Sequence, residues 1–320
     1  MAGARGGQGS RADRLFLRNV IAEDLPPQLA PALPAPDRSE VALEPPAQEP
    51  GSWAGASSAV VTPDGIVMAY RLRTGSQRGC SVAIARSADG IHFETIELVA
   101  KEDMDSESLE RPALVLTDWG TWRLYLSCAT WGTKHWRVEM IEAPEPDAFD
   151  PTKRMMVLPG SAAVAVKDPV VKFHDGTWHL WASVHPLDDP AATDRMTTDY
   201  ASSPDGIDWT WHGHALVGRP GEWDQRGVRV SAVRFEPGQI VAYYDGRASA
   251  AENFDERTGV ATGIVPAALT QVELVPVGSG PDGLGGLRYL DIVDLKDGRE
   301  RWYYEITRPD GLHELRTEVR

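Results

Sequence analysis

Residues 169–181, PVVKFHDGTWHLW, contain a short apolar run, a turn that ends in glycine, and a second run with an aromatic residue five positions after that glycine. The pattern occurs four more times, as AVVTPDGIVMAY (59–70), ALVLTDWGTWRLY (113–125), AVRFEPGQIVAYY (232–244) and DIVDLKDGRERWYY (291–304). Short β-branched and aromatic runs on either side of a glycine-containing turn are typical of β-hairpins. The sequence therefore predicts five hairpins of one kind.

The spacing of these hairpins indicates how they are organised. Their turn glycines are 55, 56, 62 and 60 residues apart, and two elements of the form S-x-D-G-I-x-aromatic, at 87–93 and 203–209, are separated by two such repeats. Hardly any segment has the pattern of a long amphipathic helix. Five antiparallel units of this length predict an all-β fold, a five-bladed β-propeller. A β-sandwich with coincidental spacing is the alternative.

Residues 1–50 differ from the rest of the chain. Eight prolines stand between Pro26 and Pro50, which disfavours both a helix and an internal strand. We therefore expect a Pro-rich N-terminal extension at 1–50 and a propeller at 51–320. The last unit has too few strands, so a strand from residues 14–21 or 41–44 is expected to complete the fifth sheet and close the ring.

Composition excludes several classes of function. The 320 residues include 32 Lys and Arg against 47 Asp and Glu, a formal net charge of −15, and such a surface repels nucleic acid and anionic lipid. No apolar run approaches the ~20 residues of a membrane span, and residues 1–20 lack the apolar core of a secretory signal. Two cysteines are too few for a disulfide framework. We expect a cytoplasmic protein, and the Ala-, Gly- and Arg-rich composition hints at a high-GC bacterium.

No cofactor or metal is expected. The eight histidines do not cluster at the spacing of metal ligands. The sequence also contains no phosphate-binding loop of the G-x-x-x-x-G-K or G-x-G-x-x-G type and no G-x-S-x-G elbow.

The propeller geometry selects candidate site residues. The first strand of a blade lies innermost and the second returns antiparallel to it, so the start of one and the end of the other meet at the same mouth of the central funnel. Charged side chains crowd these positions, although the strands between them are apolar. Such converging groups suit a polar substrate. The predicted catalytic residues are Asp168, Glu110 and Asp245, and the predicted substrate-binding residues are Arg111, Arg229, Arg247, Trp131, His185, Asp291 and Glu305.

Structural alternatives exist for several of these residues. Asp168 directly precedes an apolar strand and is expected to face the axis, but it could instead cap the first turn of its blade. Asp245 could belong to an Asp-Gly turn. Glu110 and Arg111 could form a plain ion pair. The indoles of Trp131 and Trp136, which lie in a loop or at its edge, could pack within that loop instead of stacking on a sugar ring.

The hairpins, the S-x-D-G-I-x-[FW] elements, Lys167-Asp168-Pro169 and Trp223-Asp224 resemble the five-bladed β-propeller glycosidases, which include the arabinanase/β-xylosidase and the invertase/levansucrase clans. The resemblance covers roughly residues 51–320. It implies a funnel with three acidic residues at first-strand starts of different blades, and Asp168 corresponds to the middle aspartate. Mannoside phosphorylases, which the chain also resembles at the level of fold, use one acid.

The sequence departs from this pattern in two blades. The first blade opens with Gly55-Ala-Ser-Ser58 and the fourth with Arg229-Val230, where the pattern has acids. The missing acid could come from Glu110, Asp245, Asp291 or Glu305.

Three functions follow from these observations. The first is a glycoside hydrolase or transglycosidase that acts on a small glycoside or a sugar-bearing metabolite, with Asp168 and a second carboxylate as catalytic pair. The second is a phosphorylase-type variant with one acid and an anion held by arginines. The third is a non-catalytic sugar-binding propeller.

Overall fold

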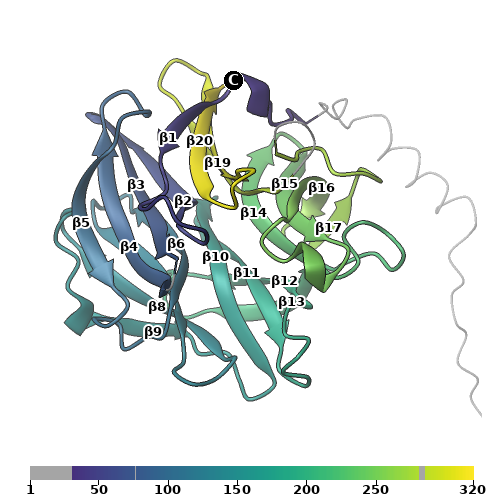
Figure 1. Cartoon of the computed structure of the whole chain (residues 1–320). Coiled ribbons are helices and arrows are strands. Elements are labelled where there is room, and N and C mark those ends of the chain that lie inside the picture. Colours follow the sequence, from purple (N-terminus) through teal and green to yellow (C-terminus); the bar gives the residue numbers. More distant parts are fainter. Residues whose placement is uncertain (1–30, 76, 281–284) are drawn as a thin grey trace, which may run out of the picture.

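The computed structural model of the chain describes residues 31–75, 77–280 and 285–320. These residues form an almost entirely β structure of twenty strands, β1 to β20, with three short 3₁₀ turns at Pro36–Arg38, Pro151–Lys153 and Ala250–Glu252. Figure 1 shows the strands gathered into sheets that lie around a common centre. No helix in the described part of the chain is long and apolar enough to cross a membrane.

Three sheets have four strands each, paired in chain order. The first contains β6 (Leu109–Leu116), β7 (Trp122–Ala129), β8 (Trp136–Ala143) and β9 (Met155–Leu158). The second contains β10 (Val164–His174), β11 (Thr177–Pro186), β12 (Thr197–Ser203) and β13 (Thr210–Leu216). The third contains β14 (Gly227–Glu236), β15 (Gln239–Arg247), β16 (Arg257–Val265) and β17 (Ala268–Gln271).

The fourth sheet has eight strands, which fall into two groups of four. One group contains β2 (Trp53–Thr62), β3 (Gly65–Thr74), β4 (Gln77–Ser87) and β5 (Glu94–Ala100). The other contains β18 (Leu287–Asp294), β19 (Glu300–Thr307), β20 (His313–Val319) and β1 (Glu40–Leu43). A single parallel pair, Trp53 with His313, joins the groups.

Strand β1 joins the first part of the described chain to its last strand, β20. It pairs antiparallel with β20, with Glu40 opposite Thr317 and Val41 opposite Arg316. Side chains strengthen this contact, because the backbone N–H of Ala35 donates to the carboxylate of Glu318 at 2.9 Å. The other strand expected to complete the last sheet, at residues 14–21, lies outside the described residues.

The repeated hairpins are β2–β3, β6–β7, β10–β11, β14–β15 and β18–β19. Their turn glycines all have positive φ, between 74° and 136°, a region that glycine enters without the steric penalty of a side chain. The aromatic residues five positions later are all buried: Tyr70, Tyr125, Trp181, Tyr243 and Tyr303.

The S-x-D-G-I elements explain one use of these aromatic residues. In each element the serine and aspartate accept backbone N–H groups of a tight turn, as Ser203 and Asp205 do for Gly206 and Ile207. The carbonyl of the turn glycine then accepts the hydroxyl of a tyrosine from a neighbouring hairpin. Tyr125 binds Gly206 in this way at 2.9 Å, which links neighbouring hairpin units.

The first strands of the hairpins line the centre of the molecule. Strand β2 contacts β6, β6 contacts β10, β10 contacts β14, β14 contacts β18, and β18 returns to β2. Apolar side chains between neighbouring groups form the hydrophobic core, in clusters such as the one that joins β2–β4 to β6–β8. The inner strands therefore surround a central space whose ends are lined by strand termini.

Candidate functional site

A shared irregularity in the inner strands brings polar side chains to one end of the ring. In each hairpin, the residue pairing between the first and the second strand shifts register once near the start of the first strand. The shift follows a residue pair with at least one polar member, either directly or, in β14–β15, one residue later. Such bulges redirect side chains. Because the pairs occupy equivalent positions, they meet around the axis: Gly55–Arg71, Glu110–Ser127, Lys167–Ser183, Arg229–Asp245 and Arg288–Glu305.

A cavity of about 350 Å³ opens at this end of the ring. Among the described residues, eight cationic side chains line it: Arg71, Arg73, Arg78, Lys134, Lys167, Arg229, Arg247 and Arg288. Four carboxylates line it as well: Glu107, Glu110, Asp194 and Glu256. Three further carboxylates directly beneath the lining, Asp168, Asp245 and Glu305, pair with its cations, so the cations of the whole cluster exceed its carboxylates by one.

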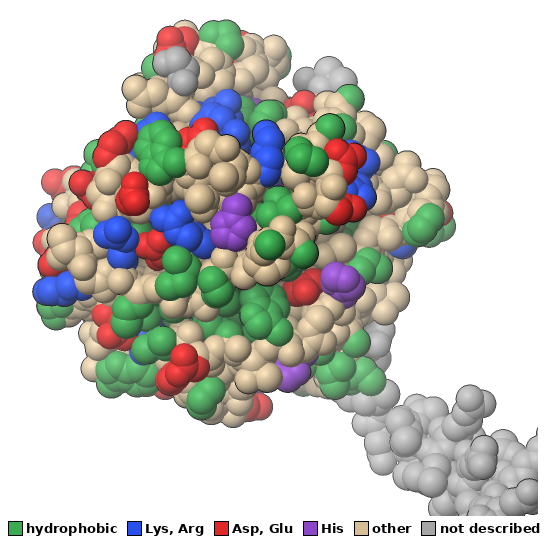
Figure 2. All heavy atoms as spheres, turned by 90° about the horizontal axis from the view of Figure 1, so that it is seen from below, with side chains coloured by type: hydrophobic (Ala, Val, Ile, Leu, Met, Phe, Trp, Pro, Cys, Tyr) green, Lys and Arg blue, Asp and Glu red, His purple; other side chains and the backbone are tan. Residues whose placement is uncertain are grey.

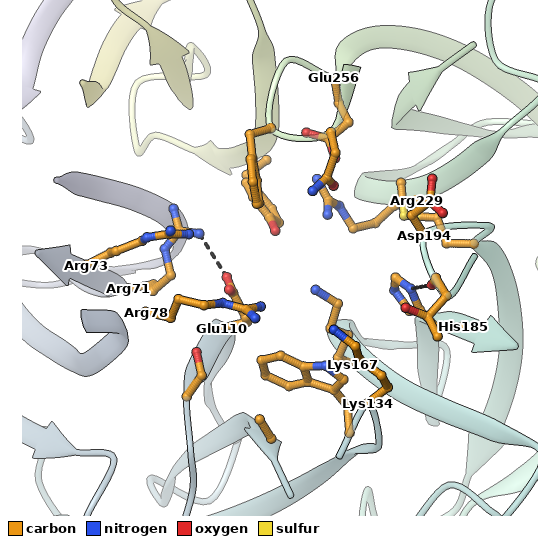
Figure 3. A pocket seen from close by; sticks show the side chains of 18 of the residues that line it. Arg71, Arg73, Arg78, Glu110, Lys134, Lys167, His185, Asp194, Arg229 and Glu256 are labelled. Carbon is orange, nitrogen blue, oxygen red and sulfur yellow. Dashed lines mark hydrogen bonds and ion pairs between the residues drawn. The ribbon is translucent and has the colours of Figure 1, made fainter. Parts of the chain in front are cut away.

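The figures show how these charges are arranged. In Figure 3, Arg78, Lys134, Lys167 and Arg229 reach toward one shared space from different sides of the cavity. On the face drawn in Figure 2, lysine and arginine side chains gather between acidic and apolar ones.

Buried arginines and carboxylates alternate along one wall, in the order Glu110, Arg71, Glu305, Arg288, Glu256 and Arg247. Arg71 bridges Glu110 at 2.8 Å and Glu305 at 2.5 Å. Burial alone would raise the pKa of Glu305, but Arg288 and Arg71 outweigh it and hold this pKa well below its usual range. The wall therefore consists of ionised, mutually neutralised groups.

Gly55 makes this wall possible. A Cβ atom at this position would lie 2.7 Å from Cγ of Glu305 and closer still to its Oε2. The absence of a side chain at position 55 thus leaves room for the Glu305–Arg71 pair.

A second buried group holds Arg229. Its guanidinium donates to Oδ2 of Asp245 at 2.8 and 3.0 Å and to Oδ2 of Asp168 at 3.3 Å. Burial raises the pKa of Asp168, but Lys167 and Arg229 outweigh it and lower this pKa, whereas burial prevails at Asp245 and raises its pKa. Oδ1 of Asp168 has no hydrogen-bond partner among the described residues. Both aspartates lie beneath the cavity lining rather than in it.

Tyr289 follows Arg288 in the bulge of β18 and has an unusual backbone conformation, with φ of 54°. Its backbone N–H lies 3.1 Å from both carboxylate oxygens of Asp245. The guanidinium of Arg229 lies 3.8 Å from the centre of its ring. The ring is 2 % exposed and lines the cavity.

Three cations at the cavity differ from the buried arginines because they form no ion pair with any described residue: Arg73, Arg78 and Lys134. The guanidinium of Arg73 stacks 4.0 Å from the ring of Trp53, and its Nε and Nη1 are enclosed without a hydrogen-bond partner in the described structure. Arg78 and Lys134 are exposed. These groups are available to a ligand.

His185 is neutral in this environment. Burial and the nearby Lys167 lower its pKa to about 3. Its Nδ1 lies 2.7 Å from the carbonyl oxygen of Thr193, so Nδ1 carries the proton and Nε2 accepts from Ser183 at 3.2 Å.

The structure distributes the predicted residues over three places. Glu110, Arg229, Arg247 and His185 line the cavity. Asp168, Asp245 and Glu305 lie beneath it and hold its arginines. Arg111, Asp291 and Trp131 do not line it: Arg111 donates to the carbonyl of Ser231 at 2.6 Å, Asp291 accepts the N–H of Ala59 at 2.7 Å, and the exposed Trp131 lies 5.9 Å from the ammonium of Lys101.

Several cavity residues were not identified from the sequence. Arg73 was expected at the mouth because it stands at the end of the first hairpin's second strand, and the alternation of a strand could have placed Arg71, two positions earlier on β3, on the same face. Arg288 directly precedes residues 289–291, where the sequence predicted the start of the last hairpin's first strand. Glu256 precedes β16 in a loop, and no pattern pointed to it. In the part of the chain that the structure describes, no three His, Cys, Asp or Glu side chains group as metal ligands.

No protein-family model and no curated protein matches this chain. Solved structures do. A β-1,2-mannobiose phosphorylase from Listeria innocua matches with a TM-score of 0.65 and 13 % identity, over 88 % of this chain and 96 % of its own. A sucrose-6-phosphate hydrolase from Lactobacillus gasseri matches with a TM-score of 0.67 and 14 % identity, over 89 % of this chain and 61 % of its own. An α-L-arabinofuranosidase from Lactobacillus brevis matches with a TM-score of 0.63 and 14 % identity, over 83 % of this chain and 90 % of its own. The chain therefore has the β-propeller fold of the glycoside hydrolase-like enzymes that its sequence resembles.

Proposed function

We propose that the chain is a carbohydrate-active enzyme that acts on a small glycoside in the central cavity and binds an anion there. The observation that carries the proposal is that three cations of the lining, Arg73, Arg78 and Lys134, form no ion pair with any described residue. The fold neighbours, whose names describe enzymes of sugar substrates, support the carbohydrate part of the proposal.

The anion is held by the cations that lack carboxylate partners among the described residues. Guanidinium and ammonium groups bind phosphate or carboxylate oxygens with charge-assisted hydrogen bonds. The buried N–H groups of Arg73 lose their hydration without gaining a partner, which favours a ligand that accepts from them. The anion is either inorganic phosphate as a second substrate or an acidic group on the sugar itself.

We favour glycosyl transfer to an anion over hydrolysis by two carboxylic groups. Hydrolysis by the usual pair requires one protonated carboxyl at the scissile bond. Burial raises the pKa of Glu110, but Arg71 and Lys167 outweigh it and lower this pKa, so the group stays ionised. Glu110 and the neutral His185 then orient sugar hydroxyls. Asp168 and Asp245 hold Arg229 in position, and Glu256 holds Arg247.

We also infer five blades, because the eight-stranded sheet consists of two groups of four strands that are joined by one residue pair. Residues 1–50 then form an extension whose strand β1 completes the last blade. A cytoplasmic location and a bacterial source stay predictions from the sequence.

The test is product detection by mass spectrometry over a panel of furanosides and pyranosides, neutral and phosphorylated, with and without inorganic phosphate. Sugar phosphate formed from neutral glycosides only when phosphate is added supports phosphorolysis. Turnover restricted to phosphorylated glycosides supports an acidic substrate. Glu110→Gln should lower turnover by ~100-fold or more, whereas Glu142→Gln, which removes a carboxylate paired with Arg123 outside the cavity, should not. Absence of turnover across the panel would contradict the proposal and favour a sugar-binding protein.

A further inference from the structure

The hydroxyl group of Tyr289 has no structural role within the described chain. It forms no hydrogen bond to any described residue, although its residue lines the cavity. The left-handed backbone of Tyr289, with φ of 54°, is shared by Ala56 and Asp168 at the equivalent bulge positions of two other inner strands, so the bulge sets it. The bulge therefore places Tyr289 at the cavity with its polar atom unused.

The surroundings of Tyr289 fix its position. The carboxylate of Asp245 accepts its backbone N–H, and the same carboxylate binds Arg229. Arg229 in turn lies 3.8 Å from the ring centre, and the guanidinium of Arg288 lies 5.2 Å from it. Asp245 thus binds the backbone of Tyr289, and the guanidinium groups of Arg229 and Arg288 lie near its ring.

Four other ionisable groups at the cavity, Glu110, Glu256, His185 and Lys167, are already engaged by neighbouring groups. Glu110 and Glu256 are ionised by their arginine partners, which lower the pKa of both groups against the effect of burial. The Nδ1 proton of His185 faces the carbonyl of Thr193. The ammonium of Lys167 lies 3.5 Å from a buried aspartate. Glycosyl transfer nonetheless requires a proton for the departing oxygen.

We propose that Tyr289 is the catalytic residue that protonates the leaving group; this inference rests on the proposed function. The bond between C1 and the glycosidic oxygen breaks, and the electron pair stays on that oxygen, which takes the hydroxyl proton of Tyr289. An oxygen of hydrogen phosphate forms the new bond to C1. The sugar phosphate then gives up its remaining acidic proton to the phenolate, which restores Tyr289.

The charges around the ring suit this cycle. Burial raises the pKa of Tyr289 well above its ordinary value, more than Arg229 lowers it, so the hydroxyl is protonated before the reaction. When the proton leaves, Arg229, Arg288 and Arg71 lie within 5.7 Å of the ring centre and stabilise the negative charge.

The test compares Tyr289→Phe with the wild-type protein on two glycosides of the same sugar, chosen from the panel above. One has an alkyl or sugar leaving group, and the other has 2,4-dinitrophenolate, which leaves without a proton. We expect kcat to fall by ~100-fold or more on the first substrate and to change by less than about fivefold on the second. The control, Tyr303→Phe, removes a hydroxyl that donates to the carbonyl of Gly90 at 2.8 Å outside the cavity and should change neither rate.

Equal losses on both glycosides, or no loss on either, would overturn the role of Tyr289 while leaving the proposed function intact. A wild-type protein without turnover of either glycoside would overturn both. If Tyr289→Phe does not fold, 3-fluorotyrosine at position 289 keeps the shape and makes the phenol more acidic. The rate on the substrate with the alkyl or sugar leaving group should then change while the rate on the 2,4-dinitrophenyl glycoside stays the same, and unchanged rates on both would contradict the inference.

Discussion

Gly55 and Glu305 occupy the same space at the buried wall of the cavity. Alanine at position 55 would push its Cβ to 2.7 Å from Cγ of Glu305, whose carboxylate is fixed by Arg71 and Arg288. We expect Gly55→Ala to lower the free energy of unfolding by roughly 1–3 kcal/mol, as overpacking of a buried site does, measured by urea unfolding. Adding Glu305→Asp, which shortens the acid, should recover part of that loss relative to the sum of the single changes. An unchanged urea midpoint in Gly55→Ala would contradict this packing.

His185 predicts a pH dependence of stability. Its pKa is about 3 in the folded chain, against about 6.5 for an unperturbed histidine. As the pH falls from 6.5 to 3, the unfolded chain takes up a proton at this position and the folded chain does not, so stability decreases. The slope from this group approaches ~1.4 kcal/mol per pH unit. His185→Gln should reduce the dependence of Tm on pH between pH 6.5 and pH 3. The control His212→Gln, at an exposed position, should leave that dependence unchanged. Equal slopes in wild type and His185→Gln would contradict the assignment.

At the scale of elements, β1 fastens the beginning of the described chain to its end. Without it, β20 loses its outer partner, Glu318 loses the N–H of Ala35, and Arg316 loses its 2.7 Å hydrogen bond to Ser39. Deletion of residues 1–50 should therefore lower Tm by roughly 5–10 °C, since several hydrogen bonds of about 1 kcal/mol each are lost. Differential scanning calorimetry measures this. A deletion variant with the Tm of the full chain would show that the last sheet does not need β1.

The hairpins were predictable from sequence because their information is local: a turn glycine, β-branched flanks and a buried aromatic at a fixed distance. The same repeats identified Glu110, Arg229, Arg247 and His185 by their places at strand ends. Which face a side chain takes after a bulge is not local, because the register shift depends on pairing with another strand. Asp168 was expected in the site, yet the bulge places it beneath the lining.

Long-range contacts explain the remaining differences. Arg71 joins Glu110 and Glu305, which lie 39 and 234 positions away in the chain, so no spacing rule could relate them. The indole of Trp131 was expected to meet a sugar, but its loop leaves it 53 % exposed beside Lys101. Trp136, the second indole that the sequence offered for a sugar ring, does line the cavity and lies 4.9 Å from the ammonium of Lys167.

At the scale of the whole molecule, a cavity with three cations that have no ion-pair partner among the described residues stands in a chain whose net charge is −15. A small anion that enters the cavity meets these cations, Arg73, Arg78 and Lys134. Exposed members of that lining, such as Arg78 and Lys134, are screened by salt. We therefore expect the apparent affinity for phosphate to fall as sodium chloride increases, measured by titration calorimetry. An affinity that does not depend on salt would argue against a charge-driven site.

Titration calorimetry of inorganic phosphate into three proteins tests the account most directly, because it does not depend on choosing the right sugar. The proteins are the wild type, Arg73→Met in the cavity, and Arg86→Met, an exposed arginine paired with Glu94 elsewhere. The account predicts one phosphate site in the wild type, binding at least ~10-fold weaker in Arg73→Met because a charge-assisted contact is lost, and unchanged binding in Arg86→Met. Absence of phosphate binding in the wild type, or equal affinity in Arg73→Met, would contradict it.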